Sequence, residues 1–340
     1  MTHEIPADVI AAFPLGKVSE IANISHGLIH QTYQITTEKG MFVLQRLHPV
    51  LAAAEIAEDF LAVTSFLCAS NFPAPHCILS RAGSVLVQDE QGKSWRLQTF
   101  LAGHTVHRID DTSSAKESGH LYARFHRVMS TFPHALKTKR IGHDTPALFA
   151  SFKETSSAFA DDALMDGVED DVRLIVEELP ALFLPDHLPL RIIHGDPKVS
   201  NILFDAAGKA TALVDLDTCN HRPLAVELGD AFRSWCGLEE DRADNHFRLD
   251  IFEAAWHGYR AAADFLTSEE IVVTGQGIGL ITLELASRFL ADYFIDSYFG
   301  WDAKRYPSRR AHNLARVRGQ IAFYKDFVSK QGEIKRILCA

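Results

Sequence analysis

The sequence lacks the features of a disulfide-stabilised or membrane-spanning protein. Its five cysteines are scattered and show no metal-ligand spacing, so we expect reduced thiols and no structural zinc site. The longest apolar region, 271–294, is interrupted by residues that include Glu284, Arg288 and Asp292, which a lipid-spanning helix would tolerate badly. Residues 1–16 contain no basic stretch followed by an apolar run, so we predict a cytoplasmic protein without a cleavable signal.

Positive charge is also scarce. The 34 Lys and Arg residues are outnumbered by 44 Asp and Glu residues, and the resulting net charge of −10 disfavours non-specific binding to nucleic-acid phosphates. Hydrophobic residues make up 47% of the chain and charged residues 23%, a balance that excludes intrinsic disorder. With 340 residues the chain is long enough for one large domain or two lobes. We therefore expect a folded monomer or homodimer whose partners are neither nucleic acids nor membranes.

The first hundred residues carry the patterns of strands around one helix. Segments 33–37 and 41–45 flank a Glu-Lys-Gly turn, as in a β-hairpin. Segment 52–70 has apolar residues at helical spacing and ends just before an Asn-Phe-Pro stop signal. Two further strands are predicted at 84–88 and 95–100. The expected order is strand, strand, helix, strand, strand.

Helical periodicity prevails after Leu101, apart from a β-rich segment at 190–214. This change of pattern predicts an α+β fold with two lobes. A small N-terminal lobe, with an antiparallel sheet and one helix, would occupy residues 1–101. A larger and mainly helical C-terminal lobe would occupy residues 102–340 and carry the β-rich segment.

Acidic and amide side chains follow the short strands of this β-rich segment. Asp196 comes after an apolar strand and a His-Gly pair, Asn201 stands five residues later, and a further strand leads to Asp215 and Asp217. Any one such residue in a turn is more often a local backbone hydrogen-bonder. Together, the spacing His-x-Asp-x-x-x-x-Asn and the later Asp match the catalytic loop and metal-binding Asp of kinases.

Phosphoryl transfer from a nucleotide needs this inventory of groups. A carboxylate must orient the attacking hydroxyl and accept its proton, and oxygen ligands must hold Mg²⁺ against the phosphates. We predict Asp196 as the base and Asn201, Asp215 and Asp217 as metal ligands. Lys198, two residues after the base, is a candidate for neutralising charge on the transferred phosphate.

The chain resembles the aminoglycoside phosphotransferase and choline kinase superfamily, the small-molecule relatives of protein kinases. Within the superfamily it is most similar to the N-acetylhexosamine 1-kinases. The catalytic loop is specific to the superfamily, and three later segments point to the sugar kinases. The resemblance covers nearly the whole chain and rests on the segments 196–203, 214–218, 228–233, 288–293 and 313–318.

The resemblance implies a bilobal protein-kinase-like fold with ATP and Mg²⁺ in the cleft between the lobes. The glycine-containing phosphate loop of the family falls on residues 25–33, where Gly27 would let the backbone approach the phosphates. The hinge whose backbone meets the adenine falls on Gln98, Phe100 and Leu101.

The chain departs from the family at the third strand, where most relatives place a Lys or Arg that holds the α- and β-phosphates. Here Gln45 occupies that position and Arg46 follows it. Arg46 is the candidate cation, but neighbouring strand residues face opposite ways, so it could replace Gln45 only through a bulge or shift. Glu58 on the following helix is either a partner for such a cation or, more simply, a solvated charge.

The acceptor site is also placed by resemblance. Arg288 and Tyr298 fall at sugar-binding positions, and Asp230 and Arg233 fall close to the catalytic centre. Arg288 lies in an apolar helix, where a charge must meet a partner or a wet cavity. Asp292, four residues later on the same face, is the alternative partner.

We therefore predict an ATP- and Mg²⁺-dependent kinase whose small-molecule hydroxyl acceptor is a carbohydrate, phosphorylated at its anomeric oxygen. One alternative acceptor is an amino alcohol, homoserine or an aminoglycoside, although Arg233 and Arg288 disfavour a cationic ligand. The absence of an Ala-Pro-Glu segment after Asp217 disfavours a protein substrate. A second alternative is a catalytically silent nucleotide-binding pseudokinase module, which Gln45 suggests and the intact catalytic loop opposes.

Overall fold

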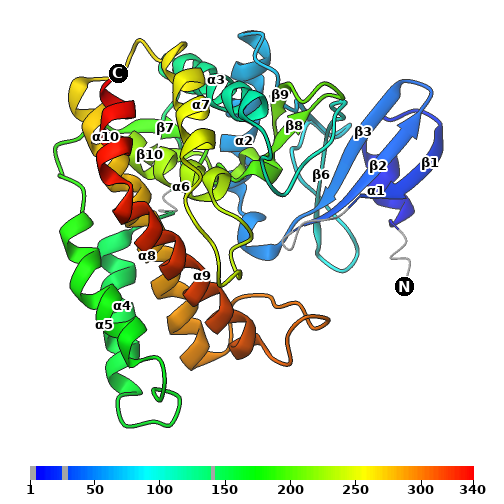
Figure 1. Cartoon of the computed structure of the whole chain (residues 1–340). Coiled ribbons are helices and arrows are strands. Elements are labelled where there is room, and N and C mark those ends of the chain that lie inside the picture. The colour runs from blue at the N-terminus through cyan, green and yellow to red at the C-terminus, as the bar shows by residue number, and fades with distance from the viewer. Residues whose placement is uncertain (1–4, 25–29, 139–141) are drawn as a thin grey trace.

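A computed structural model describes residues 5–24, 30–138 and 142–340 of the chain. Figure 1 shows a small sheet-containing lobe beside a larger helical lobe. The bilobal α+β fold predicted from the sequence is therefore confirmed. The last long strand of the sheet, β6 (Ser94–Thr99), is followed by the helices of the larger lobe.

The N-terminal lobe is built on one antiparallel sheet. The predicted hairpin is present, with Thr37 paired to Gly40 across its turn. The sequence missed the strands at both ends of the sheet and a short first helix, and the strand predicted at 84–88 is only two residues long. The sheet order is β1-β2-β3-β6-β4, with β5 paired to β6: β1 (Val18–Asn23), β2 (Gln31–Thr37), β3 (Gly40–Arg46), β4 (Cys77–Ile78), β5 (Val87–Gln88) and β6.

The two faces of this sheet differ in chemistry. One face packs Leu44, Trp95 and Leu97 against helix α1 (Ala7–Ala12) in a small apolar core. Because side chains alternate along a strand, Gln45 and Arg96 belong to the opposite face. That face is turned toward helix α2 (Ala54–Ala69), whose Phe60 ring lies under the Arg96 guanidinium.

Helices make up most of the C-terminal lobe. The long helix α8 packs against α6 and α9, while α4 and α5 project to one side of the molecule (Figure 1). Within the described part of the chain, no helix combines the length and the apolar character that crossing a bilayer requires. The helices are α3 (Thr112–Met129), α4 (Thr145–Ala158), α5 (Glu169–Glu178), α6 (Leu224–Cys236), α7 (Leu249–Arg260), α8 (Ser268–Ile295), α9 (Arg309–Ser329) and α10 (Gln331–Cys339).

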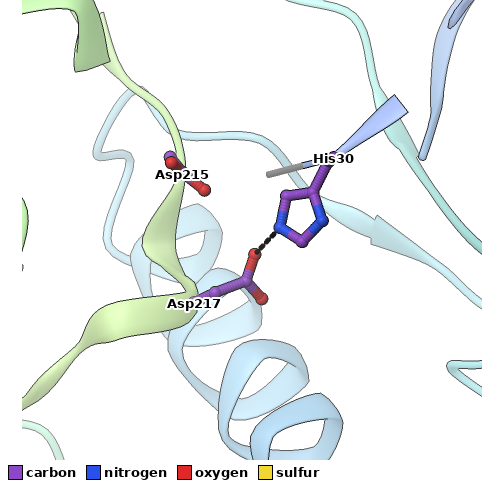
Figure 2. A group of neighbouring side chains, drawn as sticks. All are labelled: His30, Asp215 and Asp217. Carbon is purple, nitrogen blue, oxygen red and sulfur yellow. Dashed lines mark ion pairs between the residues drawn. The ribbon is translucent and has the colours of Figure 1, made fainter. Parts of the chain in front are cut away.

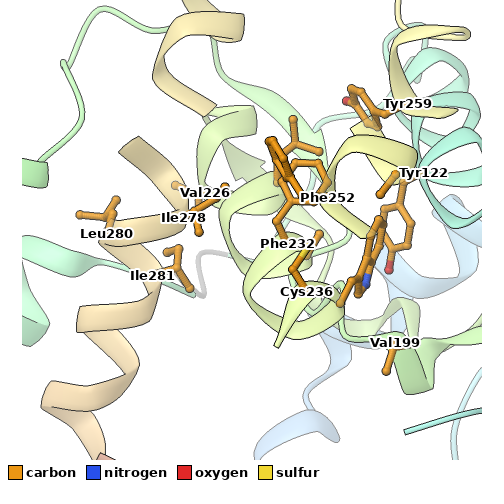
Figure 3. Close-up of a cluster of buried hydrophobic side chains, with 14 of the residues drawn as sticks. Tyr122, Val199, Val226, Phe232, Cys236, Phe252, Tyr259, Ile278, Leu280 and Ile281 are labelled. Carbon is orange, nitrogen blue, oxygen red and sulfur yellow. The ribbon is translucent and has the colours of Figure 1, made fainter. Parts of the chain in front are cut away.

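The hydrophobic core of this lobe supports the loops that carry the candidate catalytic residues. Aromatic residues of α3, α6 and α7, among them Tyr122, Phe232 and Phe252, fill the space between these helices (Figure 3). Helices α6 and α8 can approach closely because Gly277 has no side chain. A Cβ at this position would lie only 2.0 Å from the Ala225 carbonyl oxygen. A rigid, close-packed base of this kind fixes the side chains that α6 and α8 present to the site.

Four short strands frame the functional loops. Strands β7 (Arg191–Ile193) and β10 (Asn220–Arg222) pair with each other, and β8 (Ile202–Phe204) pairs with β9 (Ala210–Leu213). The segment with Asp196 and Asn201 connects β7 to β8, and Asp215 follows β9. This topology brings residues that are about twenty positions apart to one end of the small sheets.

Candidate active site

The loop after β7 gathers three of the predicted residues. The Asn201 side-chain nitrogen donates to the main-chain oxygen of Asp196 at 2.8 Å and to its carboxylate Oδ2 at 3.1 Å. The Lys198 ammonium lies 2.5 Å from the same Oδ2. Burial lowers the pKa of Lys198, but attraction to Asp196 outweighs it, so the pKa lies above the usual value. Lys198 is therefore a cation held at the carboxylate.

A buried carboxylate that the sequence analysis missed holds this loop in place. Glu227 on α6 accepts the backbone N–H groups of His194 and Gly195, both at 2.9 Å, and lies 3.3 Å from the imidazole of His126. Gly195 has a φ of +83°, and a Cβ there would lie 2.2 Å from the Thr218 carbonyl oxygen. Only glycine fits this crossing of two loops without displacement.

Asp215 has the properties of a metal ligand. It adopts a left-handed conformation with φ of 65°, and none of the described residues donates a hydrogen bond to its carboxylate. Burial, together with repulsion from Asp217 and Asp196, raises its pKa. A carboxylate that is desolvated, repelled and without a donor is stabilised by a cation. Asn201, whose side-chain oxygen is not engaged by its bonds to Asp196, is a second oxygen ligand that fits.

Asp217 stands beside Asp215 but is already paired. Both carboxylate oxygens accept from the guanidinium of Arg96, with 2.8 Å between Nη2 and Oδ2. The His30 Nε2 lies 3.6 Å from the same Oδ2, and Figure 2 shows His30, Asp215 and Asp217 gathered where the lobes meet. Burial alone would raise the pKa of Asp217, but Arg96 outweighs it and holds the pKa well below its usual range. One ligand atom from each of the three residues lies within 4.8 Å of the others, so a cation fits here as well.

Arg96 is the second residue that the sequence analysis missed. It is 1% exposed, and its Nη2 also donates to the Gln45 side-chain oxygen at 2.7 Å. Gln45 and Arg96 face each other across the β3–β6 ladder, whereas Arg46 pairs with Trp95 on the opposite face. The regular ladder has no bulge at this point. The structure therefore places Arg46, the candidate phosphate-holding cation, away from Asp217, and places Arg96 toward it.

Other nucleotide-site candidates have simpler surroundings. Glu58 is exposed and pairs with Lys137, which agrees with the solvated alternative. The Gln98 amide nitrogen lies 3.4 Å from the Gln45 oxygen, on the same face as Arg96. Phe100 and Leu101 follow the end of β6 at the predicted hinge, and the Phe100 N–H donates to the Met41 carbonyl. Gly27, the predicted phosphate-loop glycine, lies outside the described residues.

Asp196 opens onto a cavity of 470 Å³ between the catalytic loop, α6 and α8. Asp230, Arg233 and Arg288 line it. Tyr298 does not line it: its side chain is 70% exposed and packs edge-on against Phe299. The remaining wall consists of loop and helix residues, among them His143, Leu148, Glu240, Ile281, Leu285, Phe289, Phe299 and Arg316.

The charges around the cavity are organised in pairs. Asp230 and Arg233 pair at 2.7 Å, and Glu240 and Arg316 at 2.8 Å. His143, which the sequence analysis gave no role, lies 2.7 Å from Glu284 of α8. Burial lowers the pKa of His143, but the bond to Glu284 outweighs it, so its pKa is raised.

Arg288 differs from these residues because it forms no ion pair with a described carboxylate. Its guanidinium instead lies 5.6 Å above the Phe299 ring. Asp292, the alternative partner, accepts the N–H groups of residues 297–299 and the Asn313 amide at 2.8–2.9 Å. Of the two possibilities raised by the sequence, the structure thus supports the cavity. The donors of Arg288 are available to a ligand.

The chain matches a known protein family and named relatives in sequence. A model of a phosphotransferase enzyme family matches residues 20–264. The chain is 26% identical over 265 residues to a homoserine kinase of Methylobacillus flagellatus, covering 77% of this chain and 76% of the relative. It is also 26% identical over 255 residues to a homoserine kinase of Zymomonas mobilis, covering 75% of each.

Solved structures share the fold at low sequence identity. An amicoumacin kinase in complex with AMP-PNP and Ca²⁺ superposes with a TM-score of 0.64 and 15% identity, over 93% of this chain and 91% of the other. A microcompartment-associated aminopropanol kinase gives the same score and identity over 96% and 97%. An aminoglycoside phosphotransferase from Alicyclobacillus acidocaldarius gives 0.67 at 12% identity over 99% and 98%. The predicted superfamily and its kinase fold are confirmed.

Proposed function

This chain belongs to the phosphotransferase enzyme family as a small-molecule kinase that uses ATP and a divalent metal, and we propose that its acceptor is a sugar or an amino sugar. We also propose that residues 1–101 form the nucleotide-binding lobe and residues 102–340 the acceptor-binding lobe. Mg²⁺ is the metal that we expect.

The observation that carries the proposal is the pairing of every described carboxylate that lines the cavity. A cationic acceptor such as an amino alcohol or an aminoglycoside needs an unpaired carboxylate to replace the hydration of its ammonium group. The described wall offers none, because each candidate already has a cation within ion-pair distance. The pairs are Asp196–Lys198, Asp217–Arg96, Asp230–Arg233 and Glu240–Arg316.

The rest of the wall fits an uncharged ligand that carries several hydroxyl groups. Phe289 and Phe299 provide aromatic surface, and Arg288 and Arg233 provide hydrogen-bond donors beside Asp230. A cavity of 470 Å³ is within the range of about 300–1,000 Å³ that is usual for small-molecule sites. Such a mixture of apolar surface and a few directed polar groups suits a sugar ring.

Each catalytic group has a distinct task in this proposal. Asp196 orients the acceptor hydroxyl and takes its proton, and Asn201 keeps the Asp196 carboxylate turned toward the cavity. Lys198 balances negative charge at the transferred phosphoryl group. Asp215 and the Asn201 oxygen would hold Mg²⁺, which supplies electrostatic screening of the phosphates when bound.

Homoserine is the second candidate acceptor. The curated relatives described above are homoserine kinases, and the Arg288 guanidinium, which pairs with no described carboxylate, could donate hydrogen bonds to the carboxylate of homoserine. The cavity is less suited to the ammonium group of homoserine, because the described carboxylates that line it are already paired with cations. An anionic or zwitterionic acceptor would therefore depend on Arg288 more strongly than a neutral sugar does.

A coupled ADP-release screen tests the proposal. Monosaccharides, N-acylated amino sugars, homoserine, amino alcohols and aminoglycosides are compared at equal concentration with Mg²⁺ and ATP. We expect turnover with a sugar or an amino sugar and none in the same assay with Asp196→Ala. Turnover with homoserine or an amino alcohol in preference to every sugar would overturn the proposed acceptor class. A lack of turnover with all acceptors, alongside tight MgADP binding, would favour a nucleotide-binding module.

A further inference from the structure

We propose that Arg96, on strand β6, positions the metal site by fixing Asp217 and with it the turn that carries Asp215. Arg96 is in this view a positioning residue. The proposal rests on the nucleotide and metal site of the kinase, and the identity of the acceptor does not enter it.

The first support is the sheet register. Gln45 projects toward the metal-binding turn, and Arg96 is its direct partner on the neighbouring antiparallel strand. Directly opposed residues project from the same face of a sheet. A guanidinium on β6 therefore reaches the region that a strand-β3 side chain would reach, and the contact of Arg96 with the Gln45 oxygen confirms that their side chains meet.

The second support is what Arg96 joins. Asp217 belongs to the turn after β9 in the C-terminal lobe, so the Arg96–Asp217 pair connects the sheet lobe to the metal-binding turn. Each partner's side chain is only 1% exposed. A planar guanidinium that binds both carboxylate oxygens fixes orientation as well as distance. The pair therefore sets the position of the turn relative to the sheet.

The third support concerns the neighbours of Arg96. The centre of the Phe60 ring of α2 lies 3.5 Å from the guanidinium carbon. The ring occupies a place from which an acidic residue of the helix could otherwise compete with Asp217 for Arg96. Glu58 on the same helix pairs with Lys137 at the surface. Asp217 is thus the one carboxylate that pairs with Arg96 among the described residues. Asp215, two residues earlier, accepts no hydrogen bond from the described part of the chain and is available to a cation.

Calorimetric binding of MgADP, without any acceptor, tests the inference. Removing a group that orients metal ligands typically lowers affinity about 10- to 100-fold, and we expect Arg96→Gln to weaken MgADP binding to this extent. Arg81→Gln is the matched control, because its guanidinium belongs to the same lobe and contacts the Ala11 carbonyl at the surface. It should bind MgADP as the parent protein does.

A relocated cation provides the decisive comparison. Because Gln45 and Arg96 are directly opposed, Gln45→Lys combined with Arg96→Gln returns a cation to β3 opposite the same Asp217. We expect this double variant to regain most of the lost MgADP affinity. Arg96→Gln combined with Asp217→Asn removes both charges and avoids an unpaired buried carboxylate, so unchanged MgADP affinity in this variant would overturn the inference even if Arg96→Gln alone does not fold.

Three results would overturn the inference. The first is unchanged MgADP affinity in a folded variant that lacks the Arg96 charge. The second is a relocated variant that is folded but binds no better than Arg96→Gln. The third is a larger loss of affinity in Arg46→Gln than in Arg96→Gln. None of these depends on acceptor turnover, so a failed acceptor screen and a failed role for Arg96 are distinguishable.

Discussion

The side-chain amide of Asn201 binds Asp196 twice, at the main-chain oxygen and at carboxylate Oδ2. The five-residue spacing between them thus closes a loop in which the amide nitrogen orients the carboxylate. The amide oxygen of Asn201 stays available to a metal. Asn201 can thus both orient the Asp196 carboxylate and offer an oxygen ligand to a metal.

Replacing Asp196 by Ala should abolish most turnover. A positioned general base contributes about 10²–10⁴-fold to a rate, so we expect kcat to fall by about that factor. MgADP affinity and the thermal unfolding midpoint should change little, because Asp196 is not part of the core. Steady-state kinetics with calorimetry on the same preparation checks both. Retained phosphorylation would remove Asp196 as the base.

Asp215→Asn should separate stability from metal binding. The carboxylate is desolvated, repelled by its neighbours and without a hydrogen-bond donor from the described residues, so its charge opposes folding when no cation is present. We expect the variant to be more stable by about 1 kcal/mol in metal-free buffer, and to lose activity. Chemical unfolding with and without Mg²⁺ measures this. A large loss of stability in metal-free buffer would show that Asp215 has an unrecognised structural partner.

Asp292 should make stability depend on pH in the acidic range. Burial raises its pKa, but the N–H groups of residues 297–299 and Asn313 outweigh burial and lower the pKa below its ordinary value of 3.8. A carboxyl whose pKa is lower in the folded state stabilises the protein above its unfolded-state pKa. That stabilisation is lost as the pH falls through the folded-state pKa.

The corresponding variant is Asp292→Asn. We expect it to be less stable by about 1–3 kcal/mol near neutral pH, the cost of leaving buried donors without an acceptor. The difference from the parent should shrink as the pH falls below the ordinary carboxyl pKa. Urea unfolding over an acidic pH series checks this, with Asp161→Asn at the surface as the control. A difference that stays constant with pH would contradict the role of the Asp292 charge.

Gly195→Ala should disturb the catalytic loop. The residue has a left-handed backbone conformation, and its new Cβ would press on the Thr218 carbonyl oxygen at 2.2 Å. We expect a stability loss of about 1–3 kcal/mol and a lower kcat, because the loop must shift to relieve the contact. Gly92→Ala is the control, with positive φ but open space around it. Equal effects at both positions would assign the loss to φ alone.

Arg288→Met should raise the acceptor KM and leave the KM for ATP unchanged. The guanidinium lines the cavity and pairs with no carboxylate of the described residues, so losing a charged hydrogen bond to the acceptor should raise KM about 10- to 100-fold. Tyr298→Phe tests the other sugar-binding candidate. Because Tyr298 is exposed and off the cavity, we expect no change in either KM. If Tyr298→Phe raised the acceptor KM and Arg288→Met did not, the acceptor would have to bind outside the cavity.

The residues that the sequence analysis missed share one property: their partners are distant in the chain. Arg96 and Asp217 are 121 positions apart, and Glu227 reaches backbone groups about thirty residues earlier. No local periodicity records such contacts. The sequence offered one signal that could have found Arg96: it stands between Trp95 and Leu97 in a predicted strand, where a charge needs a partner.

The sequence by itself determined the features that depend on neighbours along the chain. The β2–β3 hairpin follows from alternation around a turn, and the loop from Asp196 to Asn201 follows from spacing, because both close over a few residues. Only the tertiary structure decided which charges meet. The strand register places Arg96, and not Arg46, beside Asp217. Asp292 binds backbone N–H groups and not Arg288, and Tyr298 lies at the surface. Those outcomes depend on how separate elements pack, and packing is set by the whole chain.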